Sequence, residues 1–321
     1  MRRGWRPVSS EVSASVRLFC RAAAVTAPVW IAAYFIHAGF PYLQTRGELV
    51  NWVKREAIES AQLFSPGPRS RLAAFGDSRT VCSFMPKLLD EISGGLTSSF
   101  NLGLILEKEF IGHLARICER GQCPTQVLAM SAPGLSEPAP QLSGRLPSDT
   151  ELVDTVFPFR LLPKNLFVFL TLSIKRGGPA AFYGQVRDDA AALLNDRGYR
   201  LIEWLSYYPD HRLPPDFSTP SDTPDKPRLR SVDSRSPETA ALLRLAERYG
   251  FHLILIPNYY RANECAPAAD RDQRTNHSRI VLAGPDYWLF DNHHFSDPNH
   301  LNREGARLYT QKLWQALSRI L

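Results

Sequence analysis

Two short motifs far apart in the chain carry the residue types needed for acyl transfer. The first is Gly76-Asp77-Ser78, which follows the apolar run Leu72–Phe75. The second is Asp297-Pro298-Asn299-His300, near the end of the chain. A serine, a histidine and a carboxylate can act together as nucleophile, general base and orienting group. The two motifs therefore predict an active site built from distant segments.

The proposed roles follow from the acid–base properties of these groups. A serine hydroxyl is a poor nucleophile until a base accepts its proton. His300 would accept the proton of Ser78 through one ring nitrogen, while Asp297 accepts a hydrogen bond from the other and fixes the tautomer. The separation of three residues lets Asp297 and His300 project from a single turn. A simple turn at Ser78 and a helix-capping loop at His300 are the structural alternatives.

The segments around these motifs predict strands that alternate with helices. The expected strands are 72–75, 99–104, 126–130, 252–256 and 287–290. The expected helices are a juxtamembrane helix at 47–64 and the helices 83–91, 107–120, 237–249 and 303–320. This alternation indicates an α/β fold with a mainly parallel sheet covered on both faces. Ligands of such sheets bind beyond the carboxyl ends of the strands, where Ser78 falls.

The positive charge of the chain is concentrated at its N-terminus. Residues 1–21 contain five arginines and one glutamate, which account for +4 of the formal net charge of +6. The remaining residues are close to neutral, so the composition gives no basic surface for nucleic acid.

An apolar segment follows this basic tail. Residues 22–45 contain no Asp, Glu, Lys or Arg, and a helix of about 20 residues spans a bilayer core. A cleaved signal peptide or a buried helix is the alternative. Arginines before the segment favour a cytoplasmic N-terminus. We therefore expect a single-pass inner-membrane anchor with the C-terminal domain in the periplasm or another extracytoplasmic space.

The expected organisation has four parts. They are a cytoplasmic tail (1–21), a transmembrane anchor (22–45), a juxtamembrane linker (46–70) and the catalytic domain (71–321), which carries an insertion at about 132–236. Inside the insertion, Leu166–Leu172 is too short to span a membrane. It reads as a core helix, with a helix that touches the membrane as the alternative.

The cysteines and histidines suggest no metal site and no cofactor. Cys118 and Cys123 could form a local disulfide in an oxidising compartment, or remain two separate thiols. No Cys-x-x-Cys pair is present, which argues against structural zinc. His293 and His294 precede the second motif, but a metal site with His300 would need a further well-spaced ligand.

Together the motifs resemble the GDSL/SGNH hydrolase superfamily over about residues 70–321. The matching residues are Gly76-Asp77-Ser78, Asn101-Leu102-Gly103 and Asp297-x-x-His300. Within it, the chain is most similar to the membrane-anchored, exported branch that modifies cell-envelope polysaccharides, including relatives of alginate O-acetyltransferases. The resemblance implies a flavodoxin-like three-layer α/β/α sandwich and a triad of Ser78, His300 and Asp297.

The resemblance also implies an oxyanion hole, and here the sequence departs from the family. Gly103 and Asn101 are the candidates from the second block. Where the family's third block usually supplies an asparagine, this chain has Ser131, which could donate instead. Leu106 stands where a further glycine is often found. Losing one oxyanion donor can cost about 10²–10³ in rate.

The resulting hypothesis is an exported serine enzyme that moves an O-acyl group, such as acetyl, to or from an envelope polysaccharide. The aromatic residues Trp204, Tyr207, Tyr208, Tyr259 and Tyr260 could stack on sugar rings or pack in the core. One alternative is a carboxylesterase or lipase for small esters. Another is a catalytically silent, polysaccharide-binding or scaffold subunit that accompanies an integral-membrane acyltransferase. The acyl group, its donor and the polymer stay open.

Overall fold

Five parallel strands form the central sheet. Side by side they are β2 (Thr97–Asn101), β1 (Ser70–Phe75), β3 (Gln126–Ala129), β4 (His252–Leu255) and β6 (Ile280–Leu282). Every neighbouring pair is parallel. The computed structural model describes residues 9–43, 46–104, 110–130, 162–201, 206–227, 237–268 and 278–321. The predicted α/β class with a parallel sheet is confirmed.

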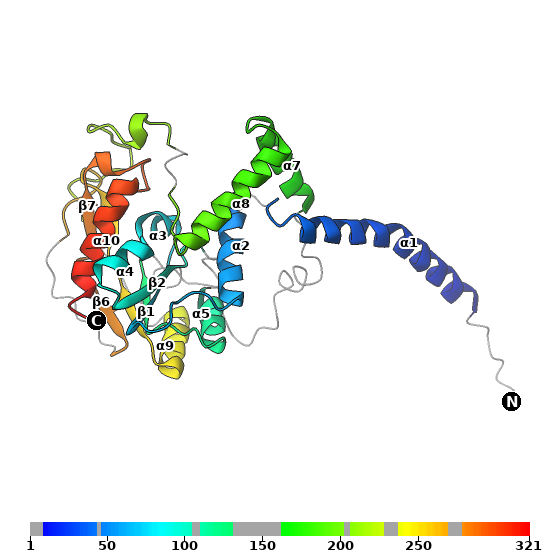
Figure 1. The fold of residues 1–321 in the computed structure, drawn as a ribbon, viewed down its shortest axis with the longest axis horizontal. Helices are drawn as coiled ribbons and strands as arrows, with labels where there is room; N and C mark the ends of the chain where they lie inside the picture. The colour runs from blue at the N-terminus through cyan, green and yellow to red at the C-terminus, as the bar shows by residue number, and fades with distance from the viewer. Residues whose placement is uncertain are drawn as a thin grey trace. The chain divides into compact units, whose positions relative to one another are not determined.

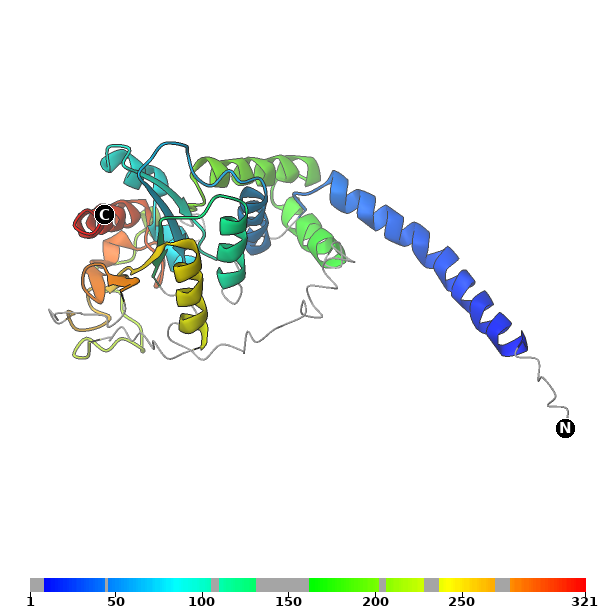
Figure 2. The ribbon, with the colours of Figure 1, turned by 90° about the horizontal axis from the view of Figure 1, so that it is seen from below.

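Both faces of the sheet are covered by helices. Side chains of a strand alternate between its two faces, and along β1 Leu72 and Ala74 enter one core while Ala73 and Phe75 enter the other. The helices that pack on the Phe75 face are α2 (Arg46–Glu59), α5 (Phe110–Glu119) and α9 (Pro237–Tyr249). The helices on the Leu72 face are α4 (Pro86–Ile92) and α10 (Arg303–Leu317). Figures 1 and 2 show α9 and α10 on opposite sides of the sheet.

The last predicted strand takes a different place from the one expected. Residues 287–290 do form a strand, β7 (Tyr287–Phe290), but it pairs with β5 (Asn258–Arg261) in a separate two-stranded sheet. The fifth strand of the main sheet is β6, which has three residues. A run this short carries no readable periodicity, so the sequence analysis missed it.

The juxtamembrane segment forms the expected helix, as α2, and this helix contributes to the core. Leu49, Val50, Val53, Ala57 and Ile58 of α2 are almost fully buried. This apolar stripe recurs at helical spacing, and Ala57 and Ile58 belong to the same core as β1 and α5. The helix α2 is therefore part of the α/β unit.

The chain divides into two compact units. The larger, residues 46–143 and 188–321, contains both sheets. The smaller, residues 1–45 and 144–187, contains α1 (Ser9–Gly39), α7 (Leu162–Ile174) and the start of α8 (Pro179–Asn195). Within α1, Val16–Gly39 is long and apolar enough to cross a membrane. This property is compatible with a signal sequence or with a single membrane anchor.

One local disulfide closes the turn after α5. Cys118 and Cys123 are bonded, which is the first of the two possibilities that the sequence left open. Cys20 is an exposed thiol, whereas Cys82 and Cys265 are buried.

Gly198 allows the chain to pass close to the end of β2. Its φ is +84°, and a Cβ there would lie 2.0 Å from the carbonyl oxygen of Asn101. Gly250 has a similar φ of +78°, but an added Cβ would meet nothing within 4 Å. The two glycines thus share the backbone conformation and differ only in the space around them.

We expect Gly198→Ala to destabilise the protein more than Gly250→Ala. Both variants incur the left-handed strain of about 1–2 kcal/mol, and Gly198→Ala adds an overpacking cost of about 1–3 kcal/mol. Thermal unfolding of the full chain in detergent measures the difference, which should be several degrees in Tm. Equal Tm values for the two variants would contradict this close approach.

Candidate active site

Ser78 is the first residue of the short helix α3 (Ser78–Ser83), directly beyond the carboxyl end of β1. Asp77 caps this helix: its Oδ1 accepts a hydrogen bond of 2.9 Å from the N–H of Arg79. The same carboxylate forms an ion pair with the Arg79 guanidinium at 3.1 Å. Asp77 therefore fixes the turn and leaves Ser78 at the start of the helix, half-buried at the sheet edge.

A small loop before α10 presents His300 and Asp297 together. An antiparallel bridge between Phe295 and Leu301 closes this loop, and the N–H of Ser296 donates to the carbonyl of His300 at 2.9 Å. Asp297 Oδ1 also accepts from the N–H groups of Asn299 and His300, at 2.8 and 3.0 Å. The loop conformation thus fixes the carboxylate beside the imidazole.

The three predicted residues meet in one hydrogen-bonded chain. His300 Nε2 lies 2.8 Å from Ser78 Oγ, and His300 Nδ1 lies 2.9 Å from Asp297 Oδ2. An ionised carboxylate can only accept, so Nδ1 carries the hydrogen, and Nε2 of the neutral ring is then the acceptor for the serine hydroxyl. This arrangement can remove the proton of Ser78 as its oxygen attacks a carbonyl.

The environment of Asp297 keeps it ionised. Its partial burial by itself would raise the pKa of the carboxyl group. The hydrogen bond and charge of His300, with the two backbone N–H groups, outweigh this effect and lower the pKa below its usual value. Asp297 can therefore orient the ring and stabilise an imidazolium at neutral pH.

Two of the three predicted oxyanion donors are occupied by structural hydrogen bonds. Asn101 is fully buried, and its Nδ2 donates to the carbonyls of Thr80 and Phe84, both at 2.8 Å. Its Oδ1 accepts the N–H of Gly103 at 3.0 Å. Asn101 and Gly103 therefore hold α3 in place. Ser131, like Leu106, lies outside the described residues.

A buried lysine lies behind Gly103. Lys54 of α2 is fully buried, and its Nζ donates to the carbonyl of Gly103 at 2.5 Å. Burial lowers the pKa of this amine well below its usual value, and the nearby Arg200 acts in the same direction. Sequence reasoning missed Lys54, because one lysine in an amphipathic helix gives no sign of burial.

The loop from Phe295 to Leu301, called the triad loop below, is also held by a residue of the two-stranded sheet of β5 and β7. Arg261, at the end of β5, is 2% exposed, and its guanidinium binds both oxygens of Asp222 at 2.6 and 3.1 Å. Its Nε donates to the carbonyl of Pro298, inside the triad loop, at 3.3 Å. Arg261 thus connects residue 222 of the insertion to the segment that carries Asp297 and His300. The sequence analysis did not single out this arginine.

Residues 213–217 of the insertion are attached to the same region. The N–H of Leu213 donates to the carbonyl of Phe295 at 3.0 Å, and Asn292 Nδ2 donates to the carbonyls of Pro215 and Phe217, both at 2.9 Å. These residues of the insertion therefore support the loop that carries Asp297 and His300.

The aromatic residues considered for sugar stacking occupy different environments. Tyr259 is buried, and its hydroxyl donates to the carbonyl of Arg79 at 3.4 Å. Tyr208 packs edge-on against Phe217, and Tyr260 packs edge-on against Tyr287. Tyr207 is fully exposed, and Trp204 lies outside the described residues. Core packing thus accounts for Tyr259.

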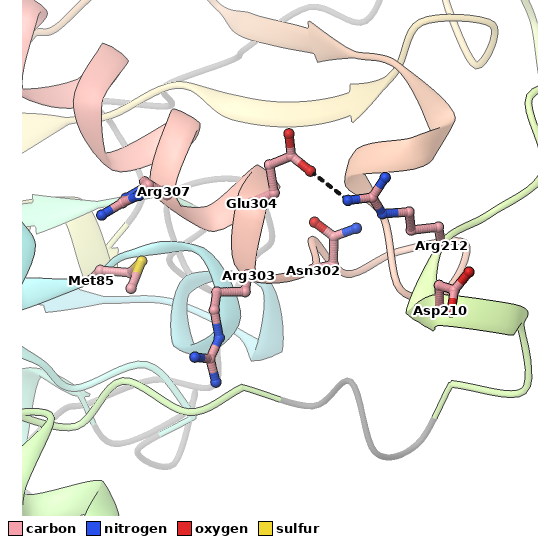
Figure 3. A pocket seen from close by; sticks show the side chains of 7 residues that line it. All are labelled: Met85, Asp210, Arg212, Asn302, Arg303, Glu304 and Arg307. Atoms are coloured by element: carbon pink, nitrogen blue, oxygen red, sulfur yellow. Dashed lines mark hydrogen bonds and ion pairs between the residues drawn. The ribbon is translucent and has the colours of Figure 1, made fainter.

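A cavity of about 740 Å³ opens beside the start of α10 (Figure 3). One of its lining residues, Asn302, follows His300 by two positions. An ion pair of 3.0 Å between Arg212 and Glu304 lies along one side of the cavity. The residues that line it are Met85, Asp210, Arg212, Asn302, Arg303, Glu304 and Arg307. Its lining is mostly charged, which suits a polar ligand better than an acyl chain.

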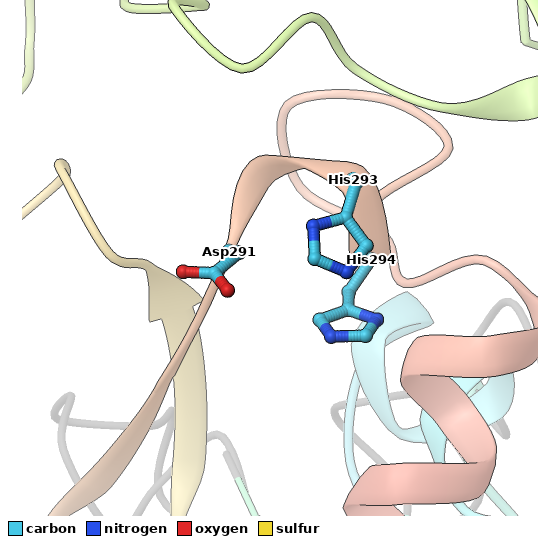
Figure 4. A group of neighbouring side chains, drawn as sticks. All are labelled: Asp291, His293 and His294. Carbon is cyan, nitrogen blue, oxygen red and sulfur yellow. The ribbon is translucent and has the colours of Figure 1, made fainter.

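Three side chains near the triad loop could offer ligand atoms to a metal ion (Figure 4). Asp291, His293 and His294 place one ligand atom each within 4.8 Å of one another. The two histidines belong to the 3-10 turn η3 (Asn292–His294). Carboxylate and imidazole donors of this kind bind zinc in other proteins. His300 is not in this group and faces Ser78 instead.

Comparison with known proteins adds no assignment. No protein-family model, no curated protein sequence and no solved structure matches this chain.

We expect Asp222→Asn to destabilise the protein in a pH-dependent way. Removing the charge leaves the buried Arg261 with only its longer ion pair to Glu264, at 3.6 Å, and losing the closer partner of a buried charge costs up to about 3–5 kcal/mol at neutral pH. Burial would raise the pKa of Asp222, but its bonds from Arg261 and Thr219 lower it overall. Its stabilising effect is thus complete above the ordinary carboxyl pKa and is lost as the pH falls through the lower, folded-state pKa.

Chemical unfolding at several pH values checks this expectation. The difference in unfolding free energy between the parent and Asp222→Asn should shrink below about pH 4. Glu304→Gln is the matched control, because it breaks the exposed pair with Arg212 and should cost at most about 1 kcal/mol. An equally small effect of Asp222→Asn would show that the buried pair does not support the loop.

Proposed function

We propose that this protein is a membrane-anchored serine acyl-ester enzyme of the GDSL/SGNH type, in which Ser78 forms an acyl-enzyme. The observation that carries the proposal is the continuous chain from Ser78 Oγ through His300 to Asp297, with contacts of 2.8 and 2.9 Å. If the loop at His300 only capped a helix, nothing would require the His300 ring to lie between the Asp297 carboxylate and Ser78, which is 222 residues away in the sequence.

The sheet supports the finer assignment of the fold. Its order, β2-β1-β3-β4-β6, corresponds to 2-1-3-4-5 among its own strands. That order is typical of flavodoxin-like three-layer α/β/α sandwiches, whose sites lie at the carboxyl ends of the strands. Ser78 occupies such an end, directly after β1.

We further infer that the site works on the outer side of the inner membrane. None of the described side chains in the candidate span of α1 is buried, and the arginines before it favour a cytoplasmic N-terminus. The bond between Cys118 and Cys123 fits an oxidising compartment such as the periplasm.

The substrate we favour is an O-acyl group, such as acetyl, on a cell-envelope polysaccharide. An anchored domain stays where such polymers emerge, and the charged cavity beside α10 offers space for a polar chain. A small-ester esterase or lipase is less well supported, because the lining of this cavity is mostly charged.

A catalytically silent scaffold for an integral-membrane acyltransferase is the second candidate. The observation that favours it is the N–H of Gly103, which donates to Asn101 Oδ1 and is not free to bind an oxyanion. The N–H of Ser78 is an alternative donor, since the first N–H groups of a helix have no acceptor within the helix.

We expect a fluorophosphonate probe to label Ser78 in the full-length protein, because only an activated serine reacts rapidly. Ser78→Ala should abolish labelling, and His300→Ala should reduce it almost to background. Asp297→Asn should slow it by about 10³–10⁴, since the ring is then present but misoriented. Circular dichroism is the folding control. An unlabelled but folded parent protein would favour the scaffold.

A second measurement separates transfer from hydrolysis. If a sugar hydroxyl outcompetes water for the acyl-serine, adding polysaccharide to a labelled acyl ester should divert label from free acid to polymer ester. Ser78→Ala should abolish both products. Label found only in free acid with every acceptor would support the esterase.

A further inference from the structure

The helix α7 has one buried face and one bare apolar face. Its buried residues are Leu162, Asn165, Phe169 and Ser173, spaced three or four residues apart. Phe167, Leu170 and Ile174 lie on the other side and are 73%, 44% and 81% exposed. Their spacing of three and four residues places them on one stripe of the helix.

This stripe is too short for a membrane span. The helix has 13 residues, which corresponds to about 20 Å, whereas a bilayer core is about 30 Å thick. An apolar stripe on a short helix therefore needs a surface to lie on.

Aromatic contacts connect α7 to the end of the apolar helix α1. Tyr183 of α8 packs against Phe40 and Tyr42, just beyond the last residue of α1. The same ring contacts Phe169, on the buried face of α7. All of these residues belong to the smaller compact unit. Through Tyr183, the buried face of α7 is thus held close to the C-terminal end of α1.

The charges around the stripe suit anionic lipid. Exposed cations stand near both of its ends, Lys164 before it and Lys175 and Arg176 after it. No acidic residue occurs from Leu162 to Gly178. Aromatic residues such as Trp30, Tyr34 and Tyr42, in and after the second half of α1, are of the type that gathers at membrane interfaces.

We propose that α7 lies in the lipid interface, with Phe167, Leu170 and Ile174 in the outer hydrocarbon and the flanking cations among the headgroups. This inference rests on the proposed anchor, because the end of α1 then lies at the membrane surface. The anchor and α7 together would give the smaller unit two attachments to the bilayer.

The test uses environment-sensitive labels on the full-length protein. A Cys20→Ser background removes the exposed free thiol, while Cys82 and Cys265 are buried and Cys118 is bonded to Cys123. Single cysteines at positions 167, 170 and 174 are labelled with a bimane and reconstituted into vesicles of phosphatidylcholine and phosphatidylglycerol that carry nitroxides at known depths.

Two control positions make the outcomes distinguishable. Val29→Cys, on the exposed surface of α1, reports the proposed anchor, and Gln315→Cys, on the exposed side of α10, reports an aqueous position. Each α7 label should show blue-shifted emission and be quenched several-fold more than the label at 315, most strongly by nitroxides high on the acyl chain.

Other results would overturn the inference. If the α7 labels behave like the label at 315 while the label at 29 is quenched, the anchor stands and the interfacial helix does not. Blue-shifted emission without quenching would mean that protein, a partner or a second copy, covers the stripe. No quenching at position 29 would overturn the anchor itself.

Discussion

The position of Ser78 depends on the hydrogen bonds made by the buried side chain of Asn101. It sits at the end of β2, donates to two carbonyls of the α3 segment and accepts the N–H of Gly103. Buried polar groups are costly to leave unpaired, by about 1–3 kcal/mol each. A helix as short as α3 has little stability of its own. The amide of Asn101 therefore determines where α3 lies, and with it the position of Ser78. The sequence made this asparagine a candidate oxyanion donor, and in the structure its amide binds Thr80, Phe84 and Gly103.

The loop that carries Asp297 and His300 is held by an ion pair, whereas the Ser78 segment is held by a neutral amide. Arg261 and Asp222 are both nearly buried, at 2% and 7% exposed. Such a pair gains little over an apolar replacement, but breaking it is expensive. It serves the site because Arg261 also binds the carbonyl of Pro298. The hydrogen-bonded chain from Ser78 to Asp297 thus joins two separately fixed segments, one held by Asn101 and the other by Arg261.

Lys54 connects the fold to the segment that follows the apolar helix. Its buried amine reaches the carbonyl of Gly103, and desolvation of the ammonium is costly. That cost lowers the pKa of Lys54 and is partly offset by the short hydrogen bond. An apolar stripe alone could have packed α2 on the sheet. The lysine adds a directional contact that fixes α2 against the loop after β2.

The sequence by itself determined the alternation of strands and helices, because apolar runs such as 72–75 and the periodic pattern of 237–249 report local burial. It also placed Ser78 and His300 in turns beside those elements, and it marked α1 as a possible membrane segment. Only the tertiary structure decided that His300 reaches Ser78, that Asn101 and Gly103 bind each other, and that Lys54 and Arg261 are buried. Periodicity records which face of an element is covered, whereas hydrogen-bond partners depend on which distant segments become neighbours. The three-residue strand β6 and the pairing of β7 with β5 follow the same rule, since strand pairing is a property of the whole sheet.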